Sequence, residues 1–282
     1  MAGRIPVLIG DDHAKVVTAV PSPGASAATG PAPSAGPLLA GPPEAPAIVF
    51  VHGTRLTGAM WAGQQAALAD AFRTIAIDLP GHGTRAEERF TLDAATDLLA
   101  ATIDEHAAGG RAVVVGLSLG GYVAMALGAR HPERVRGLVL SGATAEPVGL
   151  RMVPYLALAA AMDGIDDKQL DRINRWIFRS RFPPAIADPI IAGGFWSHGG
   201  AIALRAIARE RFVPRLAAYP GPSLLINGGL DLPFRLFAPA FAAAAHDAQR
   251  VRLTGASHLA NLDRPAAFNA AVRRFATSLG TD

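Results

Sequence analysis

Short apolar runs alternate with longer amphipathic stretches along most of this 282-residue chain. The amphipathic stretches place Ala and Leu at helical spacing, as in residues 61–72, 92–108, 122–132 and 266–279. Continuous apolar strands that alternate with helices predict an α/β fold, a mostly parallel β-sheet flanked by helices. The apolar runs that predict its strands are rich in Val, Ile and Leu, end in glycine or a turn cluster, and occupy residues 47–53, 73–83, 111–121, 136–142, 222–228 and 250–258.

The segment at residues 145–217 interrupts this alternation. Its pattern is helical, prolines punctuate it, and it contains no convincing strand. It also concentrates aromatic residues, among them Tyr155, Phe178 and Phe212. We predict a helical cap inserted into an α/β core that is formed by residues 47–144 and 218–282.

The first 46 residues differ in composition from the rest. Residues 21–46 are almost entirely Pro, Ala, Gly and Ser, and such a segment cannot bury enough apolar surface to offset the entropy lost on ordering. Ahead of it, two short apolar runs at residues 5–10 and 15–20 are spaced to pair as a hairpin. We therefore predict that residues 1–46 form a poorly ordered extension that contains at most this short hairpin.

Composition and charge narrow the classes of function. The chain has no cysteine, which excludes disulfides, thiolate nucleophiles and Cys-based metal sites. No pair of histidines has the spacing of metal ligands on one helix face. The formal net charge is +3, and almost all of the positive charges are arginines. No dense basic run marks a nucleic-acid-binding arm. The chain also lacks a transmembrane run and a secretory signal, so we expect a cytoplasmic protein without membrane or nucleic-acid partners.

The sharpest chemical signal is Gly116-Leu117-Ser118-Leu119-Gly120, which lies between an apolar run and a helical pattern. A G-x-S-x-G sequence between a strand and a helix is typical of a nucleophile elbow, where a strained turn exposes the serine hydroxyl. A phosphate-binding loop would need a Lys-Ser/Thr pair, which is absent. We predict that Ser118 is a nucleophile, and a helix cap is the alternative interpretation.

A serine nucleophile needs a base, and the base needs an acid that orients it. Asp231 and His258 follow the last two predicted strands, where open α/β sheets build their sites. We predict Ser118, Asp231 and His258 as the catalytic residues. Glu146, just past another strand, is the second candidate for the acid.

Three further polar residues lie in predicted loops near strand ends. Asp78 precedes the serine in the chain, and we interpret it as a structural residue of its loop. We interpret His52 and His82 as structural residues or as lining of the site, and not as bases.

Several motifs occur in order across roughly residues 47–278: VHGT, DLPGHG, GLSLGG, NGGLD and GASHLANLDRPAAF. Together they resemble the α/β-hydrolase superfamily, specifically its capped serine hydrolases of the esterase and lactonase type. The GLSLGG and SHLANLDRPAAFN segments are similar to those of 3-oxoadipate enol-lactonases. The pattern departs from the family at the N-terminus, where a compact hairpin usually stands directly before the HG strand.

The resemblance implies further site residues. In this family the oxyanion hole consists of two backbone amides, which here correspond to Thr54 and Leu119. We expect the pocket wall to come from cap aromatics, namely Trp176, Phe182, Phe195 and Trp196.

These patterns lead to a functional expectation. We expect a cofactor-independent serine hydrolase that cleaves a carboxylic ester, lactone or similar acyl bond of a small molecule through an acyl-enzyme on Ser118. A perhydrolase or metal-free haloperoxidase and a C–C bond hydrolase would use the same three residues. A non-catalytic small-molecule receptor on the same fold is the alternative of another class.

Overall fold

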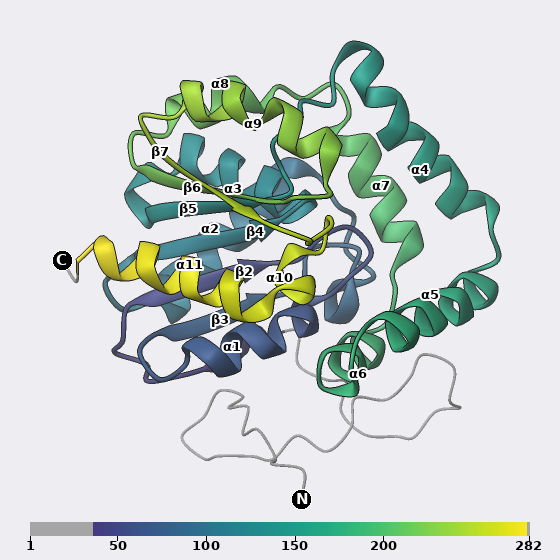
Figure 1. Ribbon diagram of the computed structural model, residues 1–282, viewed down its shortest axis with the longest axis horizontal. Coiled ribbons are helices and arrows are strands. Elements are labelled where there is room, and N and C mark those ends of the chain that lie inside the picture. The colour runs from purple at the N-terminus through teal and green to yellow at the C-terminus, as the bar shows by residue number, and fades with distance from the viewer. Residues whose placement is uncertain (1–35, 281–282) are drawn as a thin grey trace, which may run out of the picture.

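A seven-stranded sheet forms the centre of the computed structural model, which describes residues 36–280 (Figure 1). Its strand order is β1-β3-β2-β4-β5-β6-β7. Neighbouring strands are parallel except β1, which pairs antiparallel with β3. The predicted fold class, a mostly parallel sheet with flanking helices, is confirmed. The strands are β1 (Leu38–Ala40), β2 (Ala47–Val51), β3 (Arg73–Ile77), β4 (Ala112–Leu117), β5 (Val135–Ser141), β6 (Pro222–Gly228) and β7 (Asp247–Leu253).

Two hydrophobic layers sandwich the sheet, because successive side chains of a strand point to opposite faces. Ile48 and Phe50 belong to one layer, whereas Val49 and Val51 belong to the other. The central strands are therefore apolar throughout, as the sequence pattern indicated. The helices α1 (Ala62–Leu68) and α11 (Pro265–Ser278) cover the first face, and α2 (Leu92–His106), α3 (Leu119–Arg130), α8 (Phe212–Ala218) and α9 (Leu232–Ala244) cover the second.

The chain between β5 and β6 is helical. The helices α4–α7 lie beside the sheet (Figure 1). The last helix of this segment, α8, packs against α3 instead, with the ring of Phe212 centred 4.4 Å from that of Tyr122. The predicted cap boundary at residue 217 is therefore too late, because α8 belongs to the helical layer of the core. The cap helices are α4 (Val153–Gly164), α5 (Asp167–Arg181), α6 (Pro184–Gly193) and α7 (Ser197–Ile207).

Part of the predicted N-terminal extension lies in the sheet. Leu38–Ala40 form β1, Leu39 is buried, and the Gln65 side chain donates a hydrogen bond to the Leu38 carbonyl. The prediction of a poorly ordered segment is wrong for these residues, because their apolar side chains and backbone find partners at the edge of β3. The hairpin predicted at residues 5–20 lies outside the described residues.

The helices of the described part of the chain are short or polar. Among them, none combines the length and the apolar character that crossing a membrane requires.

Candidate active site

Ser118 stands at a strained corner between β4 and α3. Its backbone has φ 51° and ψ −113°, a conformation that non-glycine residues adopt rarely and mainly at functional sites. The corner needs its flanking glycines: a Cβ on Gly116 would lie 2.3 Å from the Gly120 carbonyl oxygen, and one on Gly120 would lie 2.2 Å from the Val51 oxygen. The Ser118 N–H donates to the Ser141 carbonyl at 2.8 Å. The turn is thus locked against the neighbouring strands.

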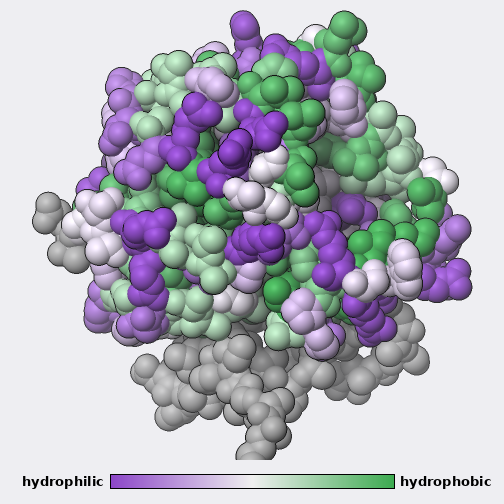
Figure 2. Space-filling model, viewed as in Figure 1, coloured by the Kyte–Doolittle hydropathy of each residue, from purple (hydrophilic) through white to green (hydrophobic). Residues whose placement is uncertain are grey.

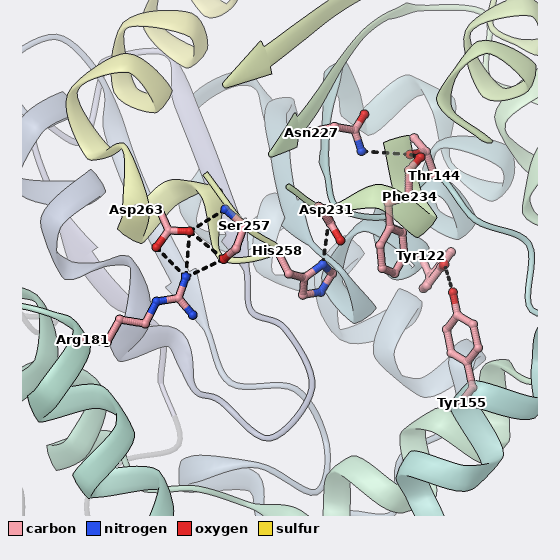
Figure 3. A network of polar contacts seen from close by, with 10 residues as sticks. All are labelled: Tyr122, Thr144, Tyr155, Arg181, Asn227, Asp231, Phe234, Ser257, His258 and Asp263. Atoms are coloured by element: carbon pink, nitrogen blue, oxygen red, sulfur yellow. Dashed lines mark hydrogen bonds and ion pairs between the residues drawn. The ribbon is translucent and has the colours of Figure 1, made fainter. Parts of the chain in front are cut away.

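Asp231 and His258 form a hydrogen-bonded pair at the ends of β6 and β7 (Figure 3). His258 Nδ1 lies 2.9 Å from Asp231 Oδ2, and the carboxyl side chain is 7% exposed whereas the imidazole is 35% exposed. Because a carboxylate accepts, Nδ1 is the donor, and this tautomer of the neutral ring presents Nε2 as the acceptor. His258 and Ser118 line the same cavity.

Close packing positions the His258 ring. Its centroid lies 4.8 Å from that of Phe234. On another side is Gly142, where a Cβ would come within 2.9 Å of the ring atoms. The ring therefore fits only because position 142 carries no side chain.

Hydrogen bonds between loops hold the segment that carries Asp231. The Thr144 hydroxyl donates to the Phe234 carbonyl at 2.7 Å and accepts from the Asn227 amide at 3.1 Å (Figure 3). The Leu230 N–H donates to the Ala256 carbonyl at 2.9 Å. These contacts join the loops after β5, β6 and β7, so Asp231 and His258 are placed by one connected unit.

Glu146, the second candidate for the acid, has a different partner. Its Oε1 accepts the Val213 N–H at 2.7 Å, at the first turn of α8, where a carboxylate satisfies an otherwise unpaired helix amide. The structure thus brings Asp231, and not Glu146, to His258.

The two amides expected at an oxyanion hole lie near Ser118. Thr54 follows β2 and lines the cavity, and Leu119 is the first residue of α3. Within residues 36–280, neither N–H is engaged in a hydrogen bond. Both are therefore available as donors.

His52 and His82 support the loop that carries Thr54. Burial lowers the pKa of His52, while burial and the neighbouring His52 lower the pKa of His82 to about 3. Both rings are therefore neutral near pH 7. His52 Nε2 accepts the Leu79 N–H at 2.9 Å, and His82 Nε2 accepts the Arg55 N–H at 3.4 Å. These contacts match the structural interpretation of the two histidines.

Asp78 is also structural. Its carboxylate accepts the N–H groups of Gly58 and Thr84 at 2.8 and 2.9 Å. It thereby ties the loop after β3 to the loop after β2.

A cavity of about 590 Å³ opens above Ser118. This volume suits a small organic molecule. Its wall is mainly apolar, and Figure 2 shows hydrophobic residues gathered over the neighbouring α4 and α9. The lining side chains include Leu56, Pro154, Tyr155, Leu158, Met162, Ile177, Phe178, Leu204, Phe234, Phe237 and Leu259.

The four aromatics predicted for the pocket wall do not line this cavity. On α5 the lining residues are Asn174, Ile177, Phe178 and Arg181, one helical face at spacings of three and four. Trp176 points away from that face and is 71% exposed. The prediction was wrong here because it counted aromatic residues without assigning them to a helix face.

The other three aromatics have structural roles. Phe182 and Phe195 pack against Phe178, with ring centroids 5.7 and 5.3 Å apart. Trp196 donates its indole N–H to the Gly193 carbonyl at 3.0 Å. They hold α5, α6 and α7 together behind the cavity wall.

Phe234 and Phe237 are lining residues that the sequence analysis missed. They lie one turn apart in α9, directly after Asp231. Their spacing and their position beside the predicted acid were a usable signal. The prediction of a pocket wall formed only by the cap left this signal unused.

A polar network joins the cap to the His258 loop (Figure 3). Arg181 of α5 donates to Asp263 at 2.7 Å and to the Ser257 hydroxyl at 2.6 Å, while the Ser257 N–H donates to Asp263 at 2.7 Å. Burial alone raises the pKa of Asp263, but the hydrogen bonds from Ser257 and Arg181 outweigh it and the pKa is lowered. An ionised Asp263 thus fixes α5 next to His258.

The central strand of this parallel sheet turns through a strained serine into a helix, and a His–Asp pair follows later strands. These features together define the α/β-hydrolase class of proteins. The alpha/beta hydrolase family model matches residues 48–271. The chain belongs to this family. The family resemblance of the sequence motifs is thereby confirmed, and so is the assignment to a family of hydrolytic enzymes.

Relatives and solved structures include esterases and lactonases. The chain is 34% identical over 166 residues to the pimeloyl-(acyl-carrier protein) methyl ester esterase of Chromobacterium violaceum, covering 55% of this chain but only 63% of that relative. It is 28% identical to 3-oxoadipate enol-lactonase 1 of Acinetobacter baylyi, over 81% of this chain and 87% of the relative. The enol-lactonase structure of Burkholderia xenovorans superposes with a TM-score of 0.72 at 28% identity, over 85% of this chain and 95% of the other.

Proposed function

We propose that this protein is a serine hydrolase that cleaves a carboxylic ester or lactone of a small molecule through an acyl-enzyme on Ser118. The observation that carries the proposal is the His258–Asp231 hydrogen bond of 2.9 Å beside a cavity that Ser118 also lines. The names of the esterase and enol-lactonase relatives support the ester or lactone bond as the substrate class.

The first half-reaction follows from the roles of these groups. Ser118 Oγ attacks the carbonyl carbon while His258 Nε2 accepts the hydroxyl proton, and Asp231 holds the imidazole in the required tautomer. The N–H groups of Thr54 and Leu119 stabilise the oxyanion of the tetrahedral intermediate. When the intermediate collapses, the C–O bond to the leaving alcohol breaks and His258 returns the proton to that oxygen.

Water completes the cycle. His258 takes a proton from water as the water oxygen attacks the acyl carbon, and collapse then breaks the bond to Ser118 Oγ. The proton passes to Ser118, the acid is released, and the free serine is restored.

A fluorophosphonate probe tests the nucleophile directly. The probe reacts with activated serines, so we expect one adduct per chain on the peptide that contains Ser118, identified by mass spectrometry. The adduct should vanish in Ser118→Ala and persist in the control Ser278→Ala at the end of α11. Absence of labelling in the wild type, or labelling at another residue, would contradict the serine-hydrolase proposal.

Two adjacent residues of α5 test the cavity wall. Ile177 lines the cavity, whereas Trp176 points to solvent. We expect Ile177→Ala to change the relative kcat/KM for esters of different acyl length by about 1–3 kcal/mol per lost contact. Trp176→Ala should leave these ratios unchanged, as kinetics on an ester series would show. A larger effect of Trp176→Ala would mean that the substrate binds elsewhere.

A further inference from the structure

The cavity is positively charged. Arg55, Arg151 and Arg181 line it, and no Asp or Glu is among its lining residues. Arg181 is paired with Asp263 at 2.7 Å, and Arg151 lies over the Phe237 ring at 5.0 Å. Arg55 forms no ion pair with any residue in the described part of the chain. Its charge therefore faces the cavity without a countercharge.

The backbone of Arg55 is held in place from several sides. It adopts a left-handed φ of 69°, directly after Thr54. Its N–H donates to His82 Nε2, and its carbonyl accepts the Trp196 N–H at 2.9 Å. The side-chain stem passes over Gly200, where a Cβ would lie 2.8 Å from Arg55 Cγ. The guanidinium is thus positioned by its surroundings, unlike that of a surface arginine.

Asn174 on α5 completes the feature. Its side chain is 3% exposed, and its Oδ1 accepts a hydrogen bond from Arg55 Nη1 at 3.2 Å. This contact orients the amide so that Nδ2 is a buried donor without a partner in the described residues. Buried donors are normally satisfied, and this residue lines the cavity. An acceptor placed in the cavity would satisfy this donor.

We propose that Arg55 and Asn174 form a carboxylate-binding subsite, so that the substrate is an ester or lactone that also bears a free carboxylate. A carboxylate has two acceptor oxygens, which can take hydrogen bonds from the guanidinium and from the Asn174 amide together. It also supplies the negative countercharge that the Arg55 guanidinium lacks within the described residues. The substrate class rests on the proposed function, but the subsite itself does not.

Paired substrates test this subsite. Monomethyl esters of dicarboxylic acids are compared with methyl esters of fatty acids of matched length, over about four to eight carbons to suit the cavity. We expect the wild type to prefer the acidic esters. Arg55→Met should lower kcat/KM for them by roughly 10- to 100-fold, and for neutral esters by no more than about threefold. Asn174→Leu should act in the same direction. Arg179→Met, which removes an exposed charge from the same helix, is the matched control and should change neither.

A binding measurement separates the subsite from the reaction. Ser118→Ala, titrated calorimetrically with the free dicarboxylates, should bind them, and Ser118→Ala/Arg55→Met should not. Equal losses on both ester series in Arg55→Met, or a wild type without preference for acidic esters, would overturn the subsite while leaving a hydrolase. Arg55-dependent dicarboxylate binding without hydrolysis of any ester would support the subsite and contradict the proposed function.

Discussion

Replacing Ser118 by alanine is expected to lower kcat for an ester substrate by roughly 10⁶-fold. In the proposed mechanism, the variant loses the atom that forms the acyl-enzyme but keeps the amides of Thr54 and Leu119 that polarise the carbonyl. A residual rate of roughly 10³–10⁴ over that in water should remain. The fold should persist, because the Ser118 side chain makes no capping hydrogen bond to α3. Steady-state kinetics and thermal unfolding of the same preparation measure both effects.

The stability measurement is the control for this variant. A melting temperature close to that of the wild type would show that lost turnover reflects lost chemistry and not unfolding. Turnover at the wild-type rate in a correctly folded Ser118→Ala would remove the basis of the acyl-enzyme proposal.

Asp231→Asn is expected to lower kcat by roughly 10³–10⁴-fold with little change in substrate binding. The amide that replaces the carboxylate can donate to His258 Nδ1, which moves the ring proton to Nε2, where it blocks abstraction of the serine proton. Kinetics of kcat and KM on one ester would show the effect.

Glu146→Gln is the matched control for this substitution. The amide oxygen of Gln can still accept the Val213 N–H that Glu146 accepts at 2.7 Å. Its kcat should therefore remain close to that of the wild type. Loss of activity in Glu146→Gln with retention in Asp231→Asn would assign the acid to Glu146.

The sheet and the strand-end residues were predictable because strong local patterns encode them. The run at residues 112–117 is apolar at every position, which only a strand buried on both faces explains well, and the glycines around Ser118 leave few alternatives to a tight turn. Parallel strands end at one edge of a sheet. The approximate location of Asp231 and His258 therefore followed from the position of each residue just after a predicted strand.

The cavity wall was not predictable from composition. Trp176 and Ile177 are neighbours in the sequence, yet α5 turns one to solvent and the other to the cavity. Only the assignment of helix faces distinguishes them, and faces depend on tertiary packing. The strand Leu38–Ala40 was missed for a related reason: three residues within a Pro-rich segment carry a weak local signal, and pairing with β3 decides their structure.

The order of the strands has a consequence for folding. Ser118 directly follows the central strand β4, whereas His258 follows β7, which is both an edge strand and the last strand in the chain. Both residues line one cavity although they lie far apart in the sequence, and contacts between distant segments close late because loop entropy opposes them. During synthesis or refolding, the serine corner and its helix can therefore form well before the histidine arrives. Recovered activity reports that the sheet has been completed to its far edge.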